Sequence, residues 1–294
     1  MPPIRKTTNR TNTRKPVTTR KKRNTKKTFA QKHKLKFIII LVVLLLFSPL
    51  YYGKLFRTAV STGRWVKDLF VFDEYPHHDE FGIRIPRKYH VHGIDVSSYQ
   101  GKINWEKVVA MESYNVKLSF AFIKATEGVT LVDSYFQRNW RESKEAGIIR
   151  GAYHYFKPKK SGKWQAKFFL QTVNLEAGDL PPVIDIEETG GLSKLELQLN
   201  LQEFLNEIEA KTKTKPIIYT GYKFFEDNIK DKFSDYTIWI AHYYQPKLKL
   251  PETAWHFWQH ADNAHIDGIK GKVDMNVFNG DEVDLSALLI QKSY

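Results

Sequence analysis

The chain has 294 residues, enough for one large domain or two small ones with a substantial core. It contains no cysteine, which excludes disulfides, thiolate nucleophiles and cysteine-ligated metals. The formal net charge of +14 belongs to a tail: residues 1–36 hold 14 Lys and Arg and no Asp or Glu, and subtraction leaves 46 − 14 = 32 basic against 32 acidic residues.

The tail over residues 1–36 is rich in Lys, Arg, Thr and Asn, a composition that predicts disorder. Specific nucleic-acid binding is not expected, because Phe29 is its only aromatic side chain and stacking platforms are therefore missing. We expect the tail to determine membrane topology or to contact anionic lipid.

An uncharged apolar run, FIIILVVLLLFSPLYY, follows over residues 37–52. It is shorter than the ~20 residues of a typical spanning helix, but Lys36 and Lys54 could extend it by snorkelling. A secretory signal core is the competing interpretation, yet no small-x-small cleavage site follows directly. We predict an uncleaved, single-pass transmembrane signal anchor over residues 37–53, with the N-terminus in the cytoplasm and the rest of the chain outside.

Residues 54–89 lack regular periodicity and are predicted to form a stalk or linker. Within it, His77 and His78 stand among acidic residues over residues 73–80. Such a cluster could ligate a metal, but its spacing matches no standard site, so a solvated linker is preferred.

Residues 90–294 alternate short apolar runs with helical stretches, which argues for a parallel sheet. Eight candidate strands fit a closed barrel better than an open sheet. The predicted fold is an α/β, irregular (β/α) TIM-like barrel with eight strands and fewer than eight helices, preceded by the disordered basic tail and one transmembrane helix. Strands are expected at 92–96, 119–124, 150–155, 182–187, 216–220, 237–242, 255–259 and 272–277. Helices are expected over 104–113 and 162–174, and from capping boxes at Ser134-x-x-Gln137 and Ser193-x-x-Glu196.

The segment VIDIE over residues 183–187 is the most informative motif of this part. Strand side chains alternate, so Asp185 and Glu187 point to one face, ~6.6 Å apart along the strand. In a poorly solvated mouth one of the two pKa values should rise, leaving a proton donor beside a carboxylate. Acid-catalysed cleavage of a glycosidic bond needs that pair, although an edge strand with two solvated acids is the alternative.

Other acids are expected to join this pair. In such barrels the chemistry lies at the C-terminal ends of the strands. Asp95 ends the first predicted strand and Asp274 lies in the last. Closing a barrel brings them to Asp185 and Glu187, whereas an open sheet would scatter them; each acid alone could equally serve as a cap or in a salt bridge.

A series of short motifs follows one another along this part of the chain: GIDVSSYQG (93–101), INW (103–105), FIKATEG (122–128), GAYHYF (151–156), DIE (185–187), IYT (218–220), WIAHY (239–243), WQ (258–259) and VDMNVF (273–278). In these motifs and their order the sequence resembles glycoside hydrolase family 25, the lysozymes (N-acetylmuramidases) of the Chalaropsis type. The resemblance covers about residues 92–285, and it departs at His260, where family members often carry an aromatic residue.

The resemblance implies hydrolysis of the β-1,4 bond between N-acetylmuramic acid and N-acetylglucosamine in the glycan strands of peptidoglycan, with no metal and no organic cofactor. It implies Glu187 as general acid and Asp185 as its ionised partner, on a retaining route assisted by the N-acetyl group of the substrate. Asp95 and Asp274 would hold that pair. Peptidoglycan as substrate places the anchor in a bacterial inner (cytoplasmic) membrane, in contact with lipid through residues 37–53, and the barrel in the periplasm or outside the cell.

Aromatic and amide side chains near the predicted strand ends suit a sugar cleft, because sugars present apolar ring faces and hydroxyl groups. About half of them could instead be core residues. Lys124 and Glu127 could reach the mouth, or form an internal ion pair. A catalytically weak or inactive membrane-tethered glycan-binding module is the alternative function. The candidate substrate-binding residues are Tyr153, Tyr155, Tyr219, Trp239, Tyr243, Trp258 and Gln259.

Overall fold

The computed structural model describes residues 29–46 and 74–292. The chain divides into two compact units, Met1–Val66 and Lys67–Tyr294, and each is described by itself.

The described part of the first unit is helix α1 (Phe29–Leu46). Residues 29–36, expected to be disordered, therefore form the first turns of a helix. The side chains from Phe37 to Val42 are exposed. Across residues 29–46 and 74–292, no helix combines the length and the apolar character needed to cross a membrane, so the predicted transmembrane helix is not found there. Residues 1–28 of the predicted tail and 47–53 of the predicted anchor lie outside the described residues.

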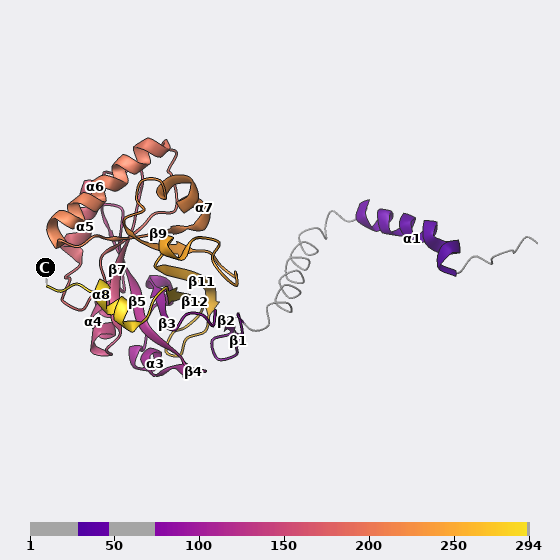
Figure 1. The fold of residues 1–294 in the computed structure, drawn as a ribbon, viewed down its shortest axis with the longest axis horizontal. Coiled ribbons are helices and arrows are strands. Elements are labelled where there is room, and N and C mark those ends of the chain that lie inside the picture. Colours follow the sequence, from indigo (N-terminus) through magenta and orange to yellow (C-terminus); the bar gives the residue numbers. More distant parts are fainter. Residues whose placement is uncertain (1–28, 47–73, 293–294) are drawn as a thin grey trace, which may run out of the picture. The chain divides into compact units, whose positions relative to one another are not determined.

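The second unit is a closed barrel of eight strands, as predicted (Figure 1). The strands pair in the order β3–β5–β7–β8–β9–β10–β11–β12, and β12 returns to β3. Two short strands, β4 (Glu112–Ser113) and β6 (Leu131–Val132), pair with β5 outside this ring. The barrel strands are β3 (Val91–Val96), β5 (Val116–Glu127), β7 (Ile149–Tyr155), β8 (Val183–Asp185), β9 (Ile217–Gly221), β10 (Thr237–Ala241), β11 (Phe257–Ala264) and β12 (Val273–Phe278).

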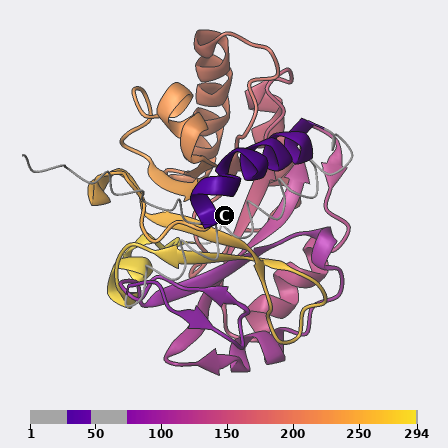
Figure 2. The ribbon, with the colours of Figure 1, turned by 90° about the vertical axis from the view of Figure 1, so that its right-hand side faces the viewer.

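The last strand corrects the expectation of a wholly parallel sheet. β12 runs antiparallel to both β11 and β3, while the other barrel neighbours are parallel. Residues 265–272, which connect β11 to β12, are too few for a crossover helix and allow only a reversal. Figure 2 shows the yellow β12 beside the purple β3. The N-terminal end of β12 therefore lies where the other strands finish, an end of the barrel that we call the mouth.

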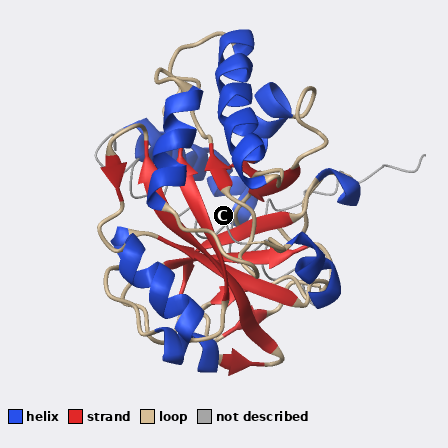
Figure 3. Cartoon of the chain, turned by 90° about the vertical axis from the view of Figure 1, so that its left-hand side faces the viewer, coloured by secondary structure: helices blue, strands red, loops and turns tan. Residues whose placement is uncertain are grey.

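Helices of the second unit lie around its strands (Figure 3). The described residues form seven α-helices, α1 included, so the prediction of fewer helices than strands is confirmed. They include α3 (Trp105–Ala110), α4 (Phe136–Glu145), α5 (Gly162–Thr172), α6 (Lys194–Thr212), α7 (Tyr222–Phe224), which leads into a π-helical turn (Phe225–Ile229), and α8 (Glu282–Leu288). Short 3-10 turns occur at Ser98–Gln100 and Glu252–Ala254.

The two predicted capping boxes have different outcomes. Ser193 and Glu196 cap α6 reciprocally, as predicted. The box at Ser134 is wrong, because α4 begins after Tyr135 and has no side-chain cap. The carboxylate of Asp133 instead accepts the backbone N–H of Tyr135 at 2.9 Å.

Aromatic rings fill the barrel interior beneath the mouth. Phe122 stacks on Trp239 with ring centroids 4.3 Å apart, and Phe120 lies 5.6 Å from Phe122. Glycines make room for these rings: a Cβ on Gly93 would lie 2.4 Å from Phe120, and one on Gly151 would lie 2.6 Å from Phe122. The packed interior confines any binding site to the mouth.

Residues 74–89, predicted as part of a linker, belong to the folded unit. They form a small hairpin of β1 (His77–His78) and β2 (Ile83–Arg84). Phe81 and Ile83 are buried in the hydrophobic core, and the backbone N–H of His265 donates to the carbonyl of Phe81 at 2.8 Å. Residues 54–73 of the predicted linker lie outside the described residues.

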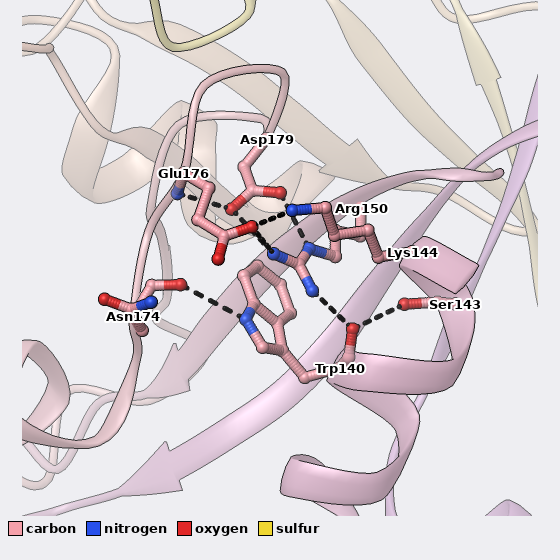
Figure 4. Close-up of polar contacts among 7 residues, drawn as sticks. All are labelled: Trp140, Ser143, Lys144, Arg150, Asn174, Glu176 and Asp179. Carbon is pink, nitrogen blue, oxygen red and sulfur yellow. Dashed lines mark hydrogen bonds and ion pairs between the residues drawn. The ribbon is translucent and has the colours of Figure 1, made fainter. Parts of the chain in front are cut away.

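A buried arginine organises the end of the barrel opposite the mouth (Figure 4). Arg150, at the start of β7, donates through Nε to Asp179 at 2.7 Å and through Nη1 to the carbonyl of Trp140 at 2.5 Å. Its guanidinium also lies 3.9 Å from the centroid of the Trp140 ring and 3.2 Å from the Glu176 carboxylate. One side chain thus joins α4, β7 and the loop before β8.

Candidate active site

A cavity of about 360 Å³ opens at the mouth of the barrel. It is lined by side chains from the ends of most barrel strands and from the loops that follow them. Ten of the eleven candidate site residues line it: Asp95, Tyr153, Tyr155, Asp185, Glu187, Tyr219, Trp239, Tyr243, Gln259 and Asp274.

Asp95 and Asp274 form a carboxyl pair on one wall. They are direct register partners on the antiparallel strands β3 and β12, and their side chains share a hydrogen bond. Burial raises the pKa of both groups, and the charge of Asp95 raises that of Asp274 further. Two neighbouring carboxyl groups cannot both ionise freely, so Asp274 holds the proton and donates it to Asp95.

Two amides fix the ionised form of Asp95. Its Oδ2 accepts Gln259 Nε2 at 2.7 Å and Asn276 Nδ2 at 2.8 Å. The amide oxygen of Asn276 accepts the indole N–H of Trp239 at 2.8 Å. Asn276 was not a candidate, although it stands two residues after Asp274 and therefore on the same strand face.

Tyrosine hydroxyl groups orient the second amide. The hydroxyl groups of Tyr219 and Tyr243 each donate to Gln259 Oε1 at 2.8 Å. Because that oxygen is occupied, the NH₂ group of Gln259 faces Asp95. The site floor is thus preorganised by hydrogen bonds from β9, β10, β11 and β12.

Asp185 and Glu187 lie on the opposite part of the cavity wall in different surroundings. Asp185 ends β8 and is buried, and its Oδ1 has no hydrogen-bond partner. Burial, reinforced by the charge of Glu187, raises the pKa of Asp185 well above its usual value. Glu187 lies in the loop after β8 and is exposed; burial of its carboxyl group by the cavity wall raises its pKa, while the positive charge of Lys124 opposes the rise.

These surroundings bear on the charge of Asp185, which was predicted to be the ionised partner of Glu187. Burial, together with an oxygen that lacks the donors needed to stabilise a carboxylate, favours the neutral form of Asp185, and burial of the Glu187 carboxyl group favours a proton there as well. The sequence could not predict these effects on Asp185 and Glu187, because they depend on how far the cavity wall buries each of the two carboxyl groups.

Lys124 was expected either to reach the mouth or to form an ion pair with Glu127, and it does both. It lines the cavity, and its ammonium group lies 2.8 Å from the Glu127 carboxylate and 5.0 Å from the centroid of the Tyr155 ring. It is therefore a cation of the site and a partner in an ion pair at the rim.

Trp258 is not among the lining residues, which corrects its assignment to the cleft. It is fully buried, and its indole N–H donates to the carbonyl of His242 at 2.9 Å. Its ring packs against Tyr89 and Trp255 outside the barrel. Adjacent strand residues face opposite ways, so Trp258 must face outward when Gln259 faces inward.

Further side chains complete the rim. Tyr99, in the turn after β3, is 91% exposed and offers a flat ring beside the acids. Asp262 and Lys272 come from the loop end of β11 and from the connection to β12. Tyr99 stands in the GIDVSSYQG motif, which was the one signal that could have found it.

The His77 and His78 motif lies at a different cavity, of about 500 Å³, near the N-terminal ends of β3 and β5. His90 and His92 line it as well. In residues 29–46 and 74–292, no group of three or more His, Asp or Glu side chains is placed to hold a metal ion.

Comparisons with known proteins agree with this geometry. The model of the family "Glycosyl hydrolases family 25" matches residues 94–269. The uncharacterized protein YegX of Escherichia coli O6:H1 is 46% identical over 256 residues, 86% of this chain and 94% of its own. Lysozyme M1 of Streptomyces globisporus is 35% identical over 213 residues, 67% of this chain and 71% of its own. The crystal structure of the bacterial lysozyme from Streptomyces coelicolor is similar with a TM-score of 0.62 and 34% identity, covering 67% of this chain and 96% of that chain.

The closed barrel with acids at its mouth is that of a glycoside hydrolase. Within that class, the chain belongs to glycosyl hydrolases family 25.

Proposed function

We propose that this enzyme hydrolyses the β-1,4 bond between N-acetylmuramic acid and N-acetylglucosamine in peptidoglycan. The observation that carries the proposal is the gathering of Asp95, Asp185, Glu187 and Asp274 around one aromatic-walled cavity. Similarity to lysozyme M1 supports the choice of substrate.

Glu187 is the proposed general acid. It is the acid of the cavity that combines exposure to an incoming glycan with a pKa raised by burial of its carboxyl group, so it keeps a proton that it can give to the leaving oxygen. Asp185, buried beside it, has a free oxygen that can accept the N–H of a substrate acetamido group. As Glu187 gives up its proton, positive charge develops at the sugar. A negative charge on Asp185 would then stabilise the transition state.

The proposed route retains the anomeric configuration, with the acetamido group of the substrate as the internal nucleophile. Asp95 and Asp274 are proposed to act indirectly, by shaping the site around Asp185 and Glu187. The amides of Gln259 and Asn276 hold Asp95 in place. The anomer formed first, followed by NMR during digestion, tests this route; a first product with the α configuration contradicts it.

Mass spectrometry of the products from purified peptidoglycan tests the bond that is cleaved. A muramidase leaves muramic acid at the reducing end. Reducing-end glucosamine would identify a glucosaminidase instead, and the absence of any new reducing end would favour the glycan-binding alternative.

Membrane anchoring is a separate proposal. We propose that residues 37–53 anchor the enzyme in a bacterial inner membrane, with the basic tail in the cytoplasm and the barrel outside. The uncharged run over residues 37–52, the basic residues before it and the exposed apolar side chains of α1 support this. Cell fractionation tests it: full-length protein should sediment with membranes and resist extraction by salt. A shortened protein in the soluble fraction would mean that the segment is cleaved.

A further inference from the structure

A lysine-rich segment leaves the edge of the active-site cavity after β7. Residues 157–167 contain five Lys and no Asp or Glu, although residues 37–294 as a whole hold equal numbers of basic and acidic residues. Lys157 stands at the rim, with its ammonium group 4.4 Å from the centroid of the Tyr155 ring. It also pairs with Glu127 at 3.1 Å and with Glu188, next to the proposed general acid, at 3.8 Å.

Two amide side chains hold the backbone of this segment. Gln165, which is fully buried, accepts the backbone N–H of Lys157 at 2.7 Å and donates to the carbonyls of Lys157 and Lys160 at 3.1 Å. Asn200 on α6 donates to the carbonyls of Pro158 and Lys160 at 2.7 Å. Lys157, Lys159 and Lys160 are therefore presented from a fixed loop and Lys163 and Lys167 from helix α5, and a fixed backbone reduces the entropy lost when a ligand binds.

A hollow of about 450 Å³ lies beside the segment. Val129, Trp164 and Phe168 give it apolar walls, and Lys160 and Lys167 supply cations. Trp164 is 63% exposed, which is unusual for so large an apolar side chain, and the Lys167 ammonium group lies 4.8 Å from its ring centroid. The hollow thus combines apolar contact area with positive charge.

The hollow adjoins the wall of the active-site cavity. The backbone N–H of Gly128 donates to the carbonyl of Tyr155 at 3.1 Å, and Val129 is the next residue. A Cβ on Gly128 would lie 3.4 Å from the side chain of Lys157, so the lysine at the rim packs against the same turn. The turn at Gly128 thus connects the wall of the cavity to the wall of the hollow.

The charges around the hollow are free to pair with a ligand. In residues 74–292, Lys160, Lys163 and Lys167 form no ion pair with an acidic side chain. A solvated surface segment accounts for free lysines, but not for an exposed Trp beside Lys167 or for the buried amide that fixes the loop over residues 157–160.

We propose that the hollow binds the acidic stem peptide carried by the muramic acid of the glycan. The proposal rests on the muramidase function proposed above. Stem peptides have free carboxylates and small apolar side chains, which complement Lys160 and Lys167 and the walls formed by Val129, Trp164 and Phe168. The enzyme would then prefer peptide-bearing strands over bare glycan.

The test compares glycan strands that carry their stem peptides with the same strands after an amidase has removed them. The full-length double variant Lys160→Glu/Lys167→Glu should lose about tenfold in kcat/KM on the peptide-bearing strands, chiefly through a higher KM. Its rate on stripped strands should equal that of the wild type. Lys211→Glu/Lys270→Glu, an equal charge change at two exposed lysines that do not line the hollow, is the control and should match the wild type on both substrates.

An equal loss on both substrates, or no loss on either, overturns the proposal. A second measurement is independent of catalysis: co-sedimentation of Glu187→Gln protein, with and without the two lysine changes, with insoluble peptidoglycan before and after stem removal. The lysine changes should weaken binding to the peptide-bearing material alone. If the wild type cleaves neither substrate, the muramidase proposal fails, and sedimentation unaffected by the lysine changes would overturn this inference separately.

Discussion

The acids of the cavity differ in how strongly their surroundings favour the charged form, because they have different hydrogen-bond partners. Asp95 receives two amide donors and is the favoured carboxylate of its pair. Asp185 is equally well buried, yet its Oδ1 receives none and burial favours its neutral form. Glu187 lies at the surface of the same cavity, where the positive charge of Lys124 stabilises its ionised form. Residue type alone does not decide these roles.

Lys124→Met should move the alkaline limb of kcat/KM to higher pH. Burial raises the pKa of Glu187, and the positive charge of Lys124 opposes that rise. Without the cation the pKa of Glu187 rises further, by up to ~1 unit, so the acid keeps its proton to a higher pH. A pH–rate profile on purified peptidoglycan measures the shift. Lys124→Arg keeps the charge and should leave the limb in place; a limb that stays fixed or moves to lower pH in Lys124→Met would contradict the assignment.

Asp274→Asn should stabilise the fold at neutral pH. The folded-state pKa of Asp274 is raised above its unfolded value, so its contribution to stability is fully present below about pH 4 and is lost as the pH rises toward the raised pKa. Asn cannot ionise, and its NH₂ group can donate to Asp95 as the protonated carboxyl does. The free energy of unfolding should increase by ~1–3 kcal/mol at pH 7 and hardly change at pH 4. Denaturant titrations at the two pH values measure it; a variant less stable than the wild type at pH 7 would refute the protonated state.

At the scale of elements, strand direction explains how Asp274 reaches the other acids. In a parallel barrel, a residue at the start of the last strand would lie at the opposite end. Because β12 runs antiparallel, the start of that strand lies at the mouth, and Asp274 pairs with Asp95. The same reversal places Asn276 beside Gln259.

The opposite end of the barrel depends on one buried ion pair. Arg150→Leu should lower the free energy of unfolding by ~3–5 kcal/mol, because it leaves Asp179 buried without its partner and removes the stacking on Trp140. Denaturant unfolding measures the loss. Arg141→Leu on the exposed face of α4 is the matched control and should change stability by no more than ~0.5 kcal/mol. Equal effects of the two variants would show that the network does not stabilise the barrel.

Strands were predicted well from the sequence where a buried apolar run ended in a polar side chain. Features that depend on tertiary contacts, such as strand direction and hydrogen bonds between strands, were predicted less well. Asp95 and Asp185 follow from strand periodicity. The reversal of β12 could have been predicted from the short connection over residues 265–272, and the outward direction of Trp258 from its adjacency to Gln259. The amide contacts to Asp95 could not, since they join residues from strands far apart in the chain.

At the scale of the whole molecule, the folded unit begins earlier than the predicted barrel. A chain that starts at residue 74 should fold and cleave soluble glycan like the full-length protein. A chain that starts at residue 91 loses Phe81, Ile83 and Ile85, each buried in the core, at a cost of ~1.5–3 kcal/mol per side chain. Thermal unfolding of both truncated proteins measures the difference; equal midpoints would show that the hairpin contributes nothing.

The residues that stabilise the barrel and the residues proposed for catalysis lie in different parts of the folded unit. Aromatic packing and the Arg150 network occupy the interior and the far end, while unpaired and proton-sharing acids gather at the mouth. Substitutions at the mouth should therefore change activity without unfolding the barrel.

The central claim is that Glu187 gives a proton to the bond that is cleaved. The most direct measurement is the turnover of purified peptidoglycan by Glu187→Gln, together with its circular dichroism spectrum. We predict an unchanged fold and a rate lower by ~10²–10⁴, the usual contribution of general acid catalysis. Turnover close to that of the wild type by a correctly folded Glu187→Gln protein would contradict the account.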